Sequence, residues 1–201
     1  AGLSRVYESL DRTADLVQNL EREAAISTDE DEVLVLLLQA GELAESRLQD
    51  TGRARQLYLK VLERDPRYLP ALRNLGRLYH AAGFWDELVE TYKRELAAST
   101  DPRVVAIRSF RVSQLLEGKL GDDTGAERFY REALRQTPDY TPALEALASL
   151  HGRRGRWKEL TEILVTRGAT LQTPKRRAEA LLRAALLAFH RLSDSAQAIQ
   201  L

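Results

Sequence analysis

The sequence predicts an all-α fold built from repeated pairs of helices, and three observations carry this prediction. First, residues 66–88 recur at 138–160, a shift of 138 − 66 = 72 residues at which proline, tyrosine, glycine and tryptophan positions meet identical residues. Second, apolar residues within this stretch follow the three-and-four spacing of a buried helical stripe. Third, no strand-like alternation with turn signals occurs anywhere in the sequence. A fixed period of this length indicates stacked units rather than one closed core.

The period extends in both directions and covers the whole chain, so we expect a single repeat domain over residues 1–201. Each period contains two helix–turn–helix units. The expected units are 1–28, 29–66, 67–100, 101–138, 139–172 and 173–201. The expected helices are 1–11, 13–25, 29–48, 51–64, 69–81, 84–97, 102–119, 123–136, 141–153, 156–170, 174–192 and 195–201.

Proline and glycine set several of the expected helix boundaries. Pro66 and Pro138 end the helices before them, because proline disfavours the helical conformation in the preceding residue. Pro102 and Pro174 follow capping side chains and start new helices. Gly83 and its counterpart one period later lie at the turn inside a helix pair, where a positive φ is expected.

The composition is that of a folded, soluble chain. Of its 201 residues, 44% are hydrophobic and 30% are charged, and there is no cysteine, which excludes disulfides and thiolate metal sites. The apolar run at residues 33–38 is too short to cross a membrane. The first residues do not form a signal peptide, so a cytoplasmic location is the default expectation.

The formal charges balance, with 30 basic and 30 acidic residues. Residues 1–100 carry 13 basic and 18 acidic side chains, a net of −5, whereas the remainder carries 17 and 12, a net of +5. Overall neutrality makes nucleic acid an unlikely main partner, because that binding depends on a basic surface that neutralises phosphates. The asymmetry would favour head-to-tail association of copies, although a chance distribution explains it equally well.

The repeated positions resemble the tetratricopeptide repeat. One unit carries the first-helix pattern and the start of the second helix: Leu75, Gly76, Tyr79, Gly83, Trp85, Leu88 and Tyr92. The next unit carries the second-helix pattern: Ala126, Tyr130, Ala133, Leu134 and Pro138. Leu88 and Glu95 depart from the family, which has alanine there, and alternate units have a longer first helix and inner turn. The resemblance therefore implies an α–α superhelix with a two-unit superrepeat, similar to arrays in large bacterial proteins, and we expect it to continue beyond both ends or to stack end to end.

The resemblance also implies a packing role for most repeated residues. Small side chains at equivalent first-helix positions would let paired helices approach closely: Gly41, Gly76, Ser113, Ala148 and Ala185. Tyrosines and a leucine would fill the space between second helices: Tyr58, Tyr92, Tyr130 and Leu164. We expect Trp85 and Trp157, at the start of their helices, to pack in the core.

The sequence offers little that points to catalysis. The histidines His80, His151 and His190 have no second histidine at metal-ligand spacing, and no phosphate-binding glycine loop or nucleophile elbow is present. We therefore expect no enzymatic activity, no metal and no cofactor, with His151 packed and His80 on the concave side. The acidic run at residues 29–32 is interpreted as a helix N-terminus. The basic cluster Arg153, Arg154, Arg156 and Lys158 is interpreted as a solvated turn, with binding of an anionic partner as the alternative.

The resemblance implies a concave groove lined by first helices. The corresponding positions are Glu42, Glu45, Arg73, Arg77, His80, Phe110, Gln114, Glu117, Glu145 and Ser149. The lysine and asparagine pattern with which part of the family binds a C-terminal carboxylate is absent. Arg73 and Arg77, four residues apart, could instead bind one acidic side chain or a phosphate, or remain solvated.

These observations predict a non-enzymatic scaffold that binds a protein or peptide in its concave groove. One alternative is an architectural spacer that associates end to end and binds nothing in the groove. Another is a nucleic-acid-binding array that uses its basic C-terminal half, which steep salt dependence would identify.

Overall fold

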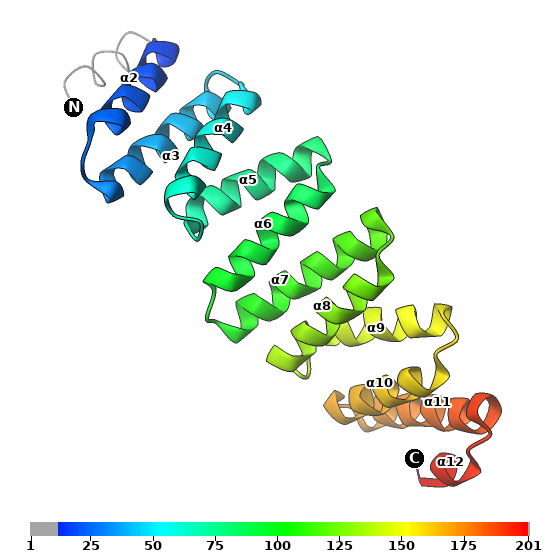
Figure 1. The fold of residues 1–201 in the computed structure, drawn as a ribbon. Helices are drawn as coiled ribbons and strands as arrows, with labels where there is room; N and C mark the ends of the chain where they lie inside the picture. The colour runs from blue at the N-terminus through cyan, green and yellow to red at the C-terminus, as the bar shows by residue number, and fades with distance from the viewer. Residues whose placement is uncertain (1–11, 201) are drawn as a thin grey trace. The chain divides into compact units, whose positions relative to one another are not determined.

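The computed structural model describes residues 12–200, and this part of the chain contains helices and their connections without a β-strand (Figure 1). The helices are α2 (Thr13–Ile26), α3 (Glu30–Ser46), α4 (Thr51–Arg64), α5 (Leu69–Ala82), α6 (Trp85–Ala98), α7 (Pro102–Leu115), η1 (Leu116–Leu120), α8 (Asp123–Gln136), α9 (Thr141–Arg153), α10 (Trp157–Thr170), α11 (Pro174–Leu192) and α12 (Ser195–Gln200). The predicted all-α fold is confirmed. The helix expected over residues 1–11, and Leu201, lie outside the described residues. None of the described helices combines the length and apolar character of a membrane span.

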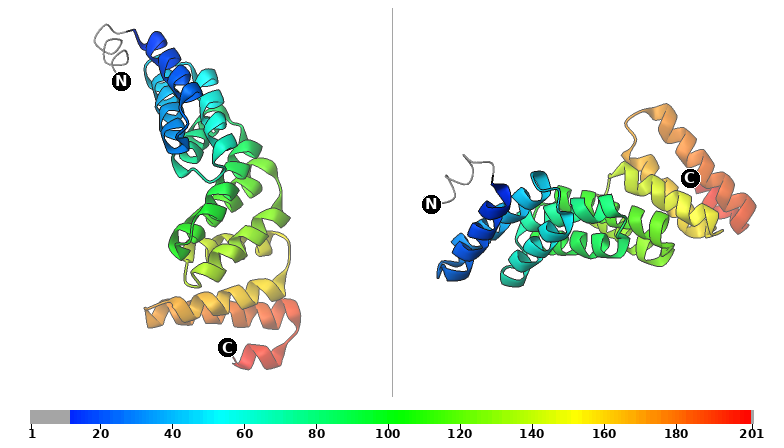
Figure 2. Two further views of the ribbon diagram at one scale, coloured as in Figure 1. Left: turned by 60° about the vertical axis from the view of Figure 1, so that its left-hand side comes forward. Right: turned by 90° about the horizontal axis from the view of Figure 1, so that it is seen from above.

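The helices form two compact units, one ending at Ala98 and the other beginning at Ser99. Within each unit every helix packs on the next one along the chain, from α2 to α6 in the first and from α7 to α12 in the second. The views in Figure 2 show successive helices of a unit running antiparallel. Contacts between sequence neighbours are what stacked helix pairs produce.

The 72-residue period is visible in the backbone conformation. Gln49, Gly121 and Ser193 are spaced by 72 residues, and their φ angles are all positive, at 55°, 67° and 55°. The aspartate after each of them donates its backbone N–H to the carbonyl oxygen six residues earlier. These bonds are Asp50 to Ala44 at 2.9 Å, Asp122 to Leu116 at 2.8 Å and Asp194 to Ala188 at 3.0 Å. A left-handed residue with such a bond closes the end of a helix, so three first helices end in the same way.

The predicted turns and caps are mostly confirmed. Gly83 and Gly155 have positive φ, at 74° and 65°. The acidic run does start a helix, because the Asp29 carboxylate accepts hydrogen bonds from two backbone N–H groups in the first turn of α3. Asp101 caps α7 in the same manner, whereas Thr173 makes no side-chain capping bond to α11.

Leucine, alanine and two tyrosines dominate the interior. Tyr58 and Tyr130 are 0% and 2% exposed, so both are buried, and the contacts found for them are with first helices, at Gly41 and Glu45 for Tyr58 and at Phe110 and Glu117 for Tyr130. Trp85 and Trp157 are half-buried, and Trp157 packs against a buried cluster as predicted, but neither ring is fully enclosed in the core. Each tryptophan ring lies over the left-handed glycine of the turn before it, at the edge of the helix pair.

The small residue at one first-helix position is required by a close approach. A Cβ atom on Gly41 would lie 2.5 Å from Cε1 of Tyr58, a separation that real Cβ atoms essentially never show. A Cβ atom on Gly76 would lie 3.5 Å from Cε1 of Tyr92, which is ordinary contact. The two glycines therefore occupy equivalent positions under different steric conditions.

The helix expected over residues 102–119 ends differently from the prediction. Regular α-helix stops at Leu115, and Leu116–Leu120 form the π-helix η1 before the left-handed Gly121. A π-turn accommodates one more residue per turn than an α-turn, which matches the longer inner turn of this unit. Glu117 lies in this segment and contacts both the second helix α8 and the next first helix α9.

Candidate functional site

The exposed face of the first helices is the candidate site, and in the first unit a tyrosine, a glutamate and an arginine join three helices there. The hydroxyl of Tyr58 on α4 donates a 3.1 Å hydrogen bond to Glu45 Oε2 on α3. Arg77 on α5 forms a two-pronged ion pair with the same carboxylate, with Nη1 bonded to Oε1 and Nη2 at 3.1 Å from Oε2. The Glu45 side chain is only 15% exposed, so it is held firmly between its two partners.

The second unit repeats this arrangement with one change. Tyr130 donates a 2.7 Å hydrogen bond to Glu117 Oε2, and both residues lie 72 positions after Tyr58 and Glu45. The residue equivalent to Arg77 is Ser149, and Arg153, one helical turn later, forms the ion pair with Glu117 instead. Nη1 of Arg153 also donates to Ser149 Oγ at 3.0 Å. The contact between successive first helices is therefore kept although its arginine has moved.

Burial and the nearby carboxylate act together on the two tyrosines. Burial, followed by the charge of Glu45 and the hydrogen bond to it, raises the pKa of Tyr58 far above its ordinary value. Burial, followed by the hydrogen bond to Glu117, has the same effect on the pKa of Tyr130. Both hydroxyls therefore remain protonated donors, and they fix the carboxylates as structural acceptors.

The other predicted groove residues of the first unit have varied surroundings. Glu42 accepts a 3.2 Å hydrogen bond from Asn74 on α5. Arg73 is exposed and forms no ion pair within the described residues. His80 is exposed, and its ring meets that of Trp85 edge-on with centroids 5.7 Å apart. The two arginines predicted to act together therefore differ, because Arg77 forms an ion pair with Glu45 whereas Arg73 has no ion pair within the described residues.

In the second unit the predicted groove residues also split into packed and exposed groups. Phe110 is half-buried between two tyrosine rings, Tyr130 at 5.7 Å and Tyr140 at 5.6 Å between centroids. Gln114 is exposed. Glu145 accepts a 2.7 Å hydrogen bond from Arg167 on α10. Phe110 therefore contributes mainly to packing between helices.

The basic cluster at the turn between α9 and α10 is largely neutralised. Arg153, Arg154 and Arg156 form ion pairs with Glu117, Asp123 and Glu127, all on the preceding helix pair. The interpretation of this turn as simply solvated therefore missed its main role, which is to join one repeat to the next. Burial raises the pKa of Glu127, but hydrogen bonds from Arg131 and Arg156 outweigh it and leave this pKa below its ordinary value.

His151 is the one predicted packed histidine, and it is fully buried at 0% exposure. Neither ring nitrogen has a hydrogen-bond partner, and Nε2 lies 3.9 Å from Glu127 Oε1. Burial lowers the pKa of His151, and this effect exceeds the opposing attraction of Glu127. No group of three or more potential metal ligands occurs among the described residues.

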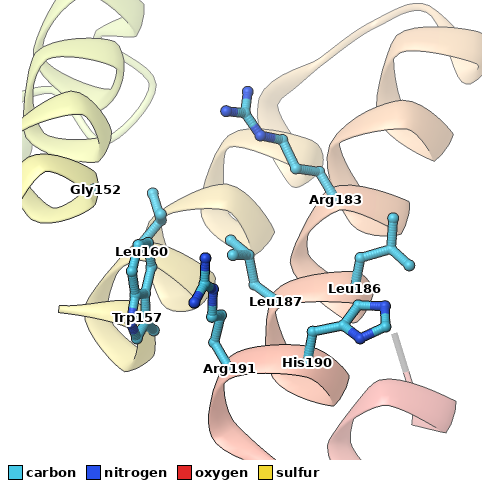
Figure 3. Close-up of a pocket in the computed structure, with 8 residues that line it drawn as sticks. All are labelled: Gly152, Trp157, Leu160, Arg183, Leu186, Leu187, His190 and Arg191. Carbon is cyan, nitrogen blue, oxygen red and sulfur yellow. The ribbon is translucent and has the colours of Figure 1, made fainter. Parts of the chain in front are cut away.

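An open pocket lies between α9, α10 and α11, and no pattern in the sequence predicted it. Its volume is about 590 Å³, and it is lined by Gly152, Trp157, Leu160, Arg183, Leu186, Leu187, His190 and Arg191. Figure 3 shows Leu187 and Arg191 projecting from α11 toward Trp157 and Leu160, with Arg183 extending from α11 above Leu187. The Arg191 guanidinium lies 4.9 Å from the centre of the Trp157 ring.

An apolar stripe runs along α11 beside this pocket. Leu182, Leu186 and Phe189 are 61%, 49% and 53% exposed, and their spacing places them on one helix face. They lie 72 positions after Phe110, Gln114 and Glu117, which are predicted groove residues. Extending the period by one more step would have identified the stripe from the sequence alone.

Comparison with known proteins agrees with this architecture. The family model for the tetratricopeptide repeat matches residues 71–106. Among solved structures, the chain is similar to MamA, with a TM-score of 0.53 and 17% identity over 85% of this chain and 88% of that one. It is also similar to YrrB, described as a TPR protein with an unusual peptide-binding site, with a TM-score of 0.52 and 17% identity over 92% of this chain and 87% of that one. No curated protein matches the sequence significantly. At these identities the likeness to solved structures establishes the fold.

Proposed function

We propose that this tetratricopeptide-repeat chain is a non-enzymatic scaffold that binds a peptide segment of a partner protein on the first-helix face of its second unit. The observation that carries the proposal is the open pocket between α9, α10 and α11, with the exposed Leu186 in its lining. A pocket with apolar walls and an exposed apolar residue at its rim suits a peptide that inserts a side chain while its backbone stays outside.

Two further observations support a peptide as the ligand. The fold is shared with YrrB, whose description includes a peptide-binding site. The pocket volume of about 590 Å³ lies within the range of ordinary ligand sites, and the exposed Leu186 is part of its lining. Of the predicted groove residues, Gln114 remains a proposal as a partner contact, because its side chain is exposed and makes no hydrogen bond within the described residues.

One observation favours a structural role for the first unit. Polar side chains on its first-helix face are bonded to one another: Glu45 to Tyr58 and Arg77, and Glu42 to Asn74. Residues that already satisfy one another offer less to a ligand, because binding would first have to break these bonds. We therefore propose that α2–α6 act mainly as a spacer, and that binding is concentrated on α9 and α11.

The test is a screen of immobilised random peptides with the labelled chain. We expect a set of bound peptides, and we expect the substitution Leu186→Ser in the pocket lining to abolish most of the signal. The matched control is Leu59→Ser, which removes one exposed apolar residue from a second helix of the first unit. Equal loss in the control, or no bound peptide at all, would contradict the proposal.

A further inference from the structure

The pocket between α9, α10 and α11 has a one-sided charge that points to the chemistry of its ligand. Its lining includes Arg183, His190 and Arg191 together with apolar side chains, and no acidic residue. We infer that this pocket selects a peptide in which one large apolar side chain is flanked by carboxylates. The inference rests on the proposed function and specifies the ligand class of the same face.

The wall of the pocket is apolar. Trp157 and Leu187 pack against a cluster that contains Leu160, Leu164 and Ala184, so they form a fixed floor for an incoming side chain. Leu186 stands exposed at the rim, one turn before His190. A large apolar side chain that enters here would remove both its own surface and that of Leu186 from water.

The arginines of the pocket differ in their ion pairing from those on the rest of the first-helix surface. Elsewhere the chain pairs its groove arginines with its own carboxylates, as in Arg77 with Glu45 and Arg153 with Glu117. Arg183 is exposed and has no ion pair within the described residues. Arg191 lies over the Trp157 ring, which orients its guanidinium without neutralising it. Both cations are therefore available to a ligand's carboxylates, and Arg191 is also oriented by its aromatic contact.

The neighbouring surface argues for a peptide over a nucleic acid. A second pocket of about 380 Å³ shares Arg183, and its lining has charges of both signs, with Glu145 and Glu179 beside Arg167 and Arg176. The basic surface is therefore interrupted within a short distance, whereas a phosphate backbone requires a continuous basic track. A peptide needs only a few carboxylates placed on either side of its apolar anchor.

The experiment uses the full chain with Trp85→Phe, so that the fluorescence of Trp157 reports on the pocket. The probe is a nine-residue peptide with blocked ends, with a central phenylalanine flanked by four glutamates on each side. Matched peptides carry a central alanine, or lysines in place of the glutamates, and a nine-nucleotide single strand of thymidylate tests the nucleic-acid reading. We expect the glutamate–phenylalanine peptide to change Trp157 fluorescence saturably and to bind more tightly than each of the other three ligands.

Two variants and one control locate the binding. Arg183→Glu should weaken affinity about ten- to a hundredfold, since it removes a charge-assisted contact and adds repulsion. Leu186→Ala should weaken it about tenfold through lost apolar burial. Arg73→Glu on α5 makes the same charge change at an exposed first-helix arginine and should leave affinity within about twofold. Far-UV circular dichroism and the melting temperature check that each variant is folded.

The outcomes separate the inference from the proposed function. If the lysine-flanked peptide binds as well as the glutamate-flanked one, and Leu186→Ala weakens both, the inference fails while the proposed function stands. Equal weakening by Arg73→Glu and Arg183→Glu, or tighter binding of the oligonucleotide, also overturns the inference. If no peptide in this set or in the immobilised screen binds, both fail.

Discussion

Replacement of Gly41 by alanine should destabilise the protein, whereas the same replacement at Gly76 should stabilise it. Both glycines lie inside first helices and are buried. In the middle of a helix alanine is favoured over glycine by about 0.5–1 kcal/mol, because it loses less conformational freedom on folding. Without tertiary contacts, therefore, both variants would be more stable than the parent.

The structure decides the sign at each position. The new methyl group at Gly41 would lie 2.5 Å from Tyr58 Cε1 and 2.8 Å from Cδ1. The ring cannot move aside easily, because Tyr58 is 0% exposed and its hydroxyl is bonded to Glu45. Overpacking costs about 1–3 kcal/mol, and an approach this close to a buried ring belongs to the upper part of that range, about 2–3 kcal/mol. After the helical gain of about 0.5–1 kcal/mol is subtracted, the net loss at Gly41 is about 1–2.5 kcal/mol. At Gly76 the nearest atom is 3.5 Å away, so the helical preference should appear as a gain of about 0.5–1 kcal/mol.

Urea unfolding followed by circular dichroism measures both changes. A second background, Tyr58→Leu, tests whether the ring is the cause, because Gly41→Ala should lose its penalty when the ring is absent. The coupling between the two substitutions should then be about 1–3 kcal/mol. If Gly41→Ala and Gly76→Ala change stability with the same sign, or if the penalty at Gly41 persists without the ring, the assigned packing is wrong.

Three further predictions concern other parts of the fold. Tyr130→Phe removes the hydroxyl bonded to Glu117 and should cost about 1.5 kcal/mol in urea unfolding. Burial lowers the pKa of His151 in the folded protein, so below about pH 6.5 the unfolded chain binds more protons than the folded one. The free energy of unfolding should therefore fall as the pH decreases through that value. His151→Leu should reduce this pH dependence in unfolding curves recorded from pH 8 to 5. Gly83→Ala, at a φ of 74°, should lower the free energy of unfolding by about 1–2 kcal/mol, whereas Gly118→Ala, whose methyl meets no atom within 4 Å, should not lower it.

The parts of the fold that depend on local chemistry could be predicted from the sequence. Pro66, Pro138 and the left-handed Gly83 set helix ends through backbone sterics, and these ends appear where expected. The burial of Tyr58 and Tyr130 was expected from their place in the second-helix pattern that resembles the tetratricopeptide repeat. A repeat reveals such positions because each unit meets the same neighbours as the one before it.

The contacts between long charged side chains could not be predicted in this way. Arg77 reaches Glu45 on another helix, yet one period later a serine stands at the Arg77 position and Arg153 makes the contact from the next turn. Long side chains reach a partner from more than one turn of a helix, so spacing alone does not assign the pair. The half-burial of Trp157 was also missed, because its ring lies at the edge of a helix pair beside the pocket.

Mapping of amide chemical shifts, while the glutamate–phenylalanine peptide is added to the isotope-labelled chain, tests where on the chain the peptide binds. We expect the largest shifts at the end of α9, at the start of α10 around Trp157, and along α11 around Arg183 and Leu186. The amides of α2–α6 should change little. Shifts concentrated in α2–α6, or spread evenly over both units, would contradict the assignment of binding to the first-helix face of α9 and α11.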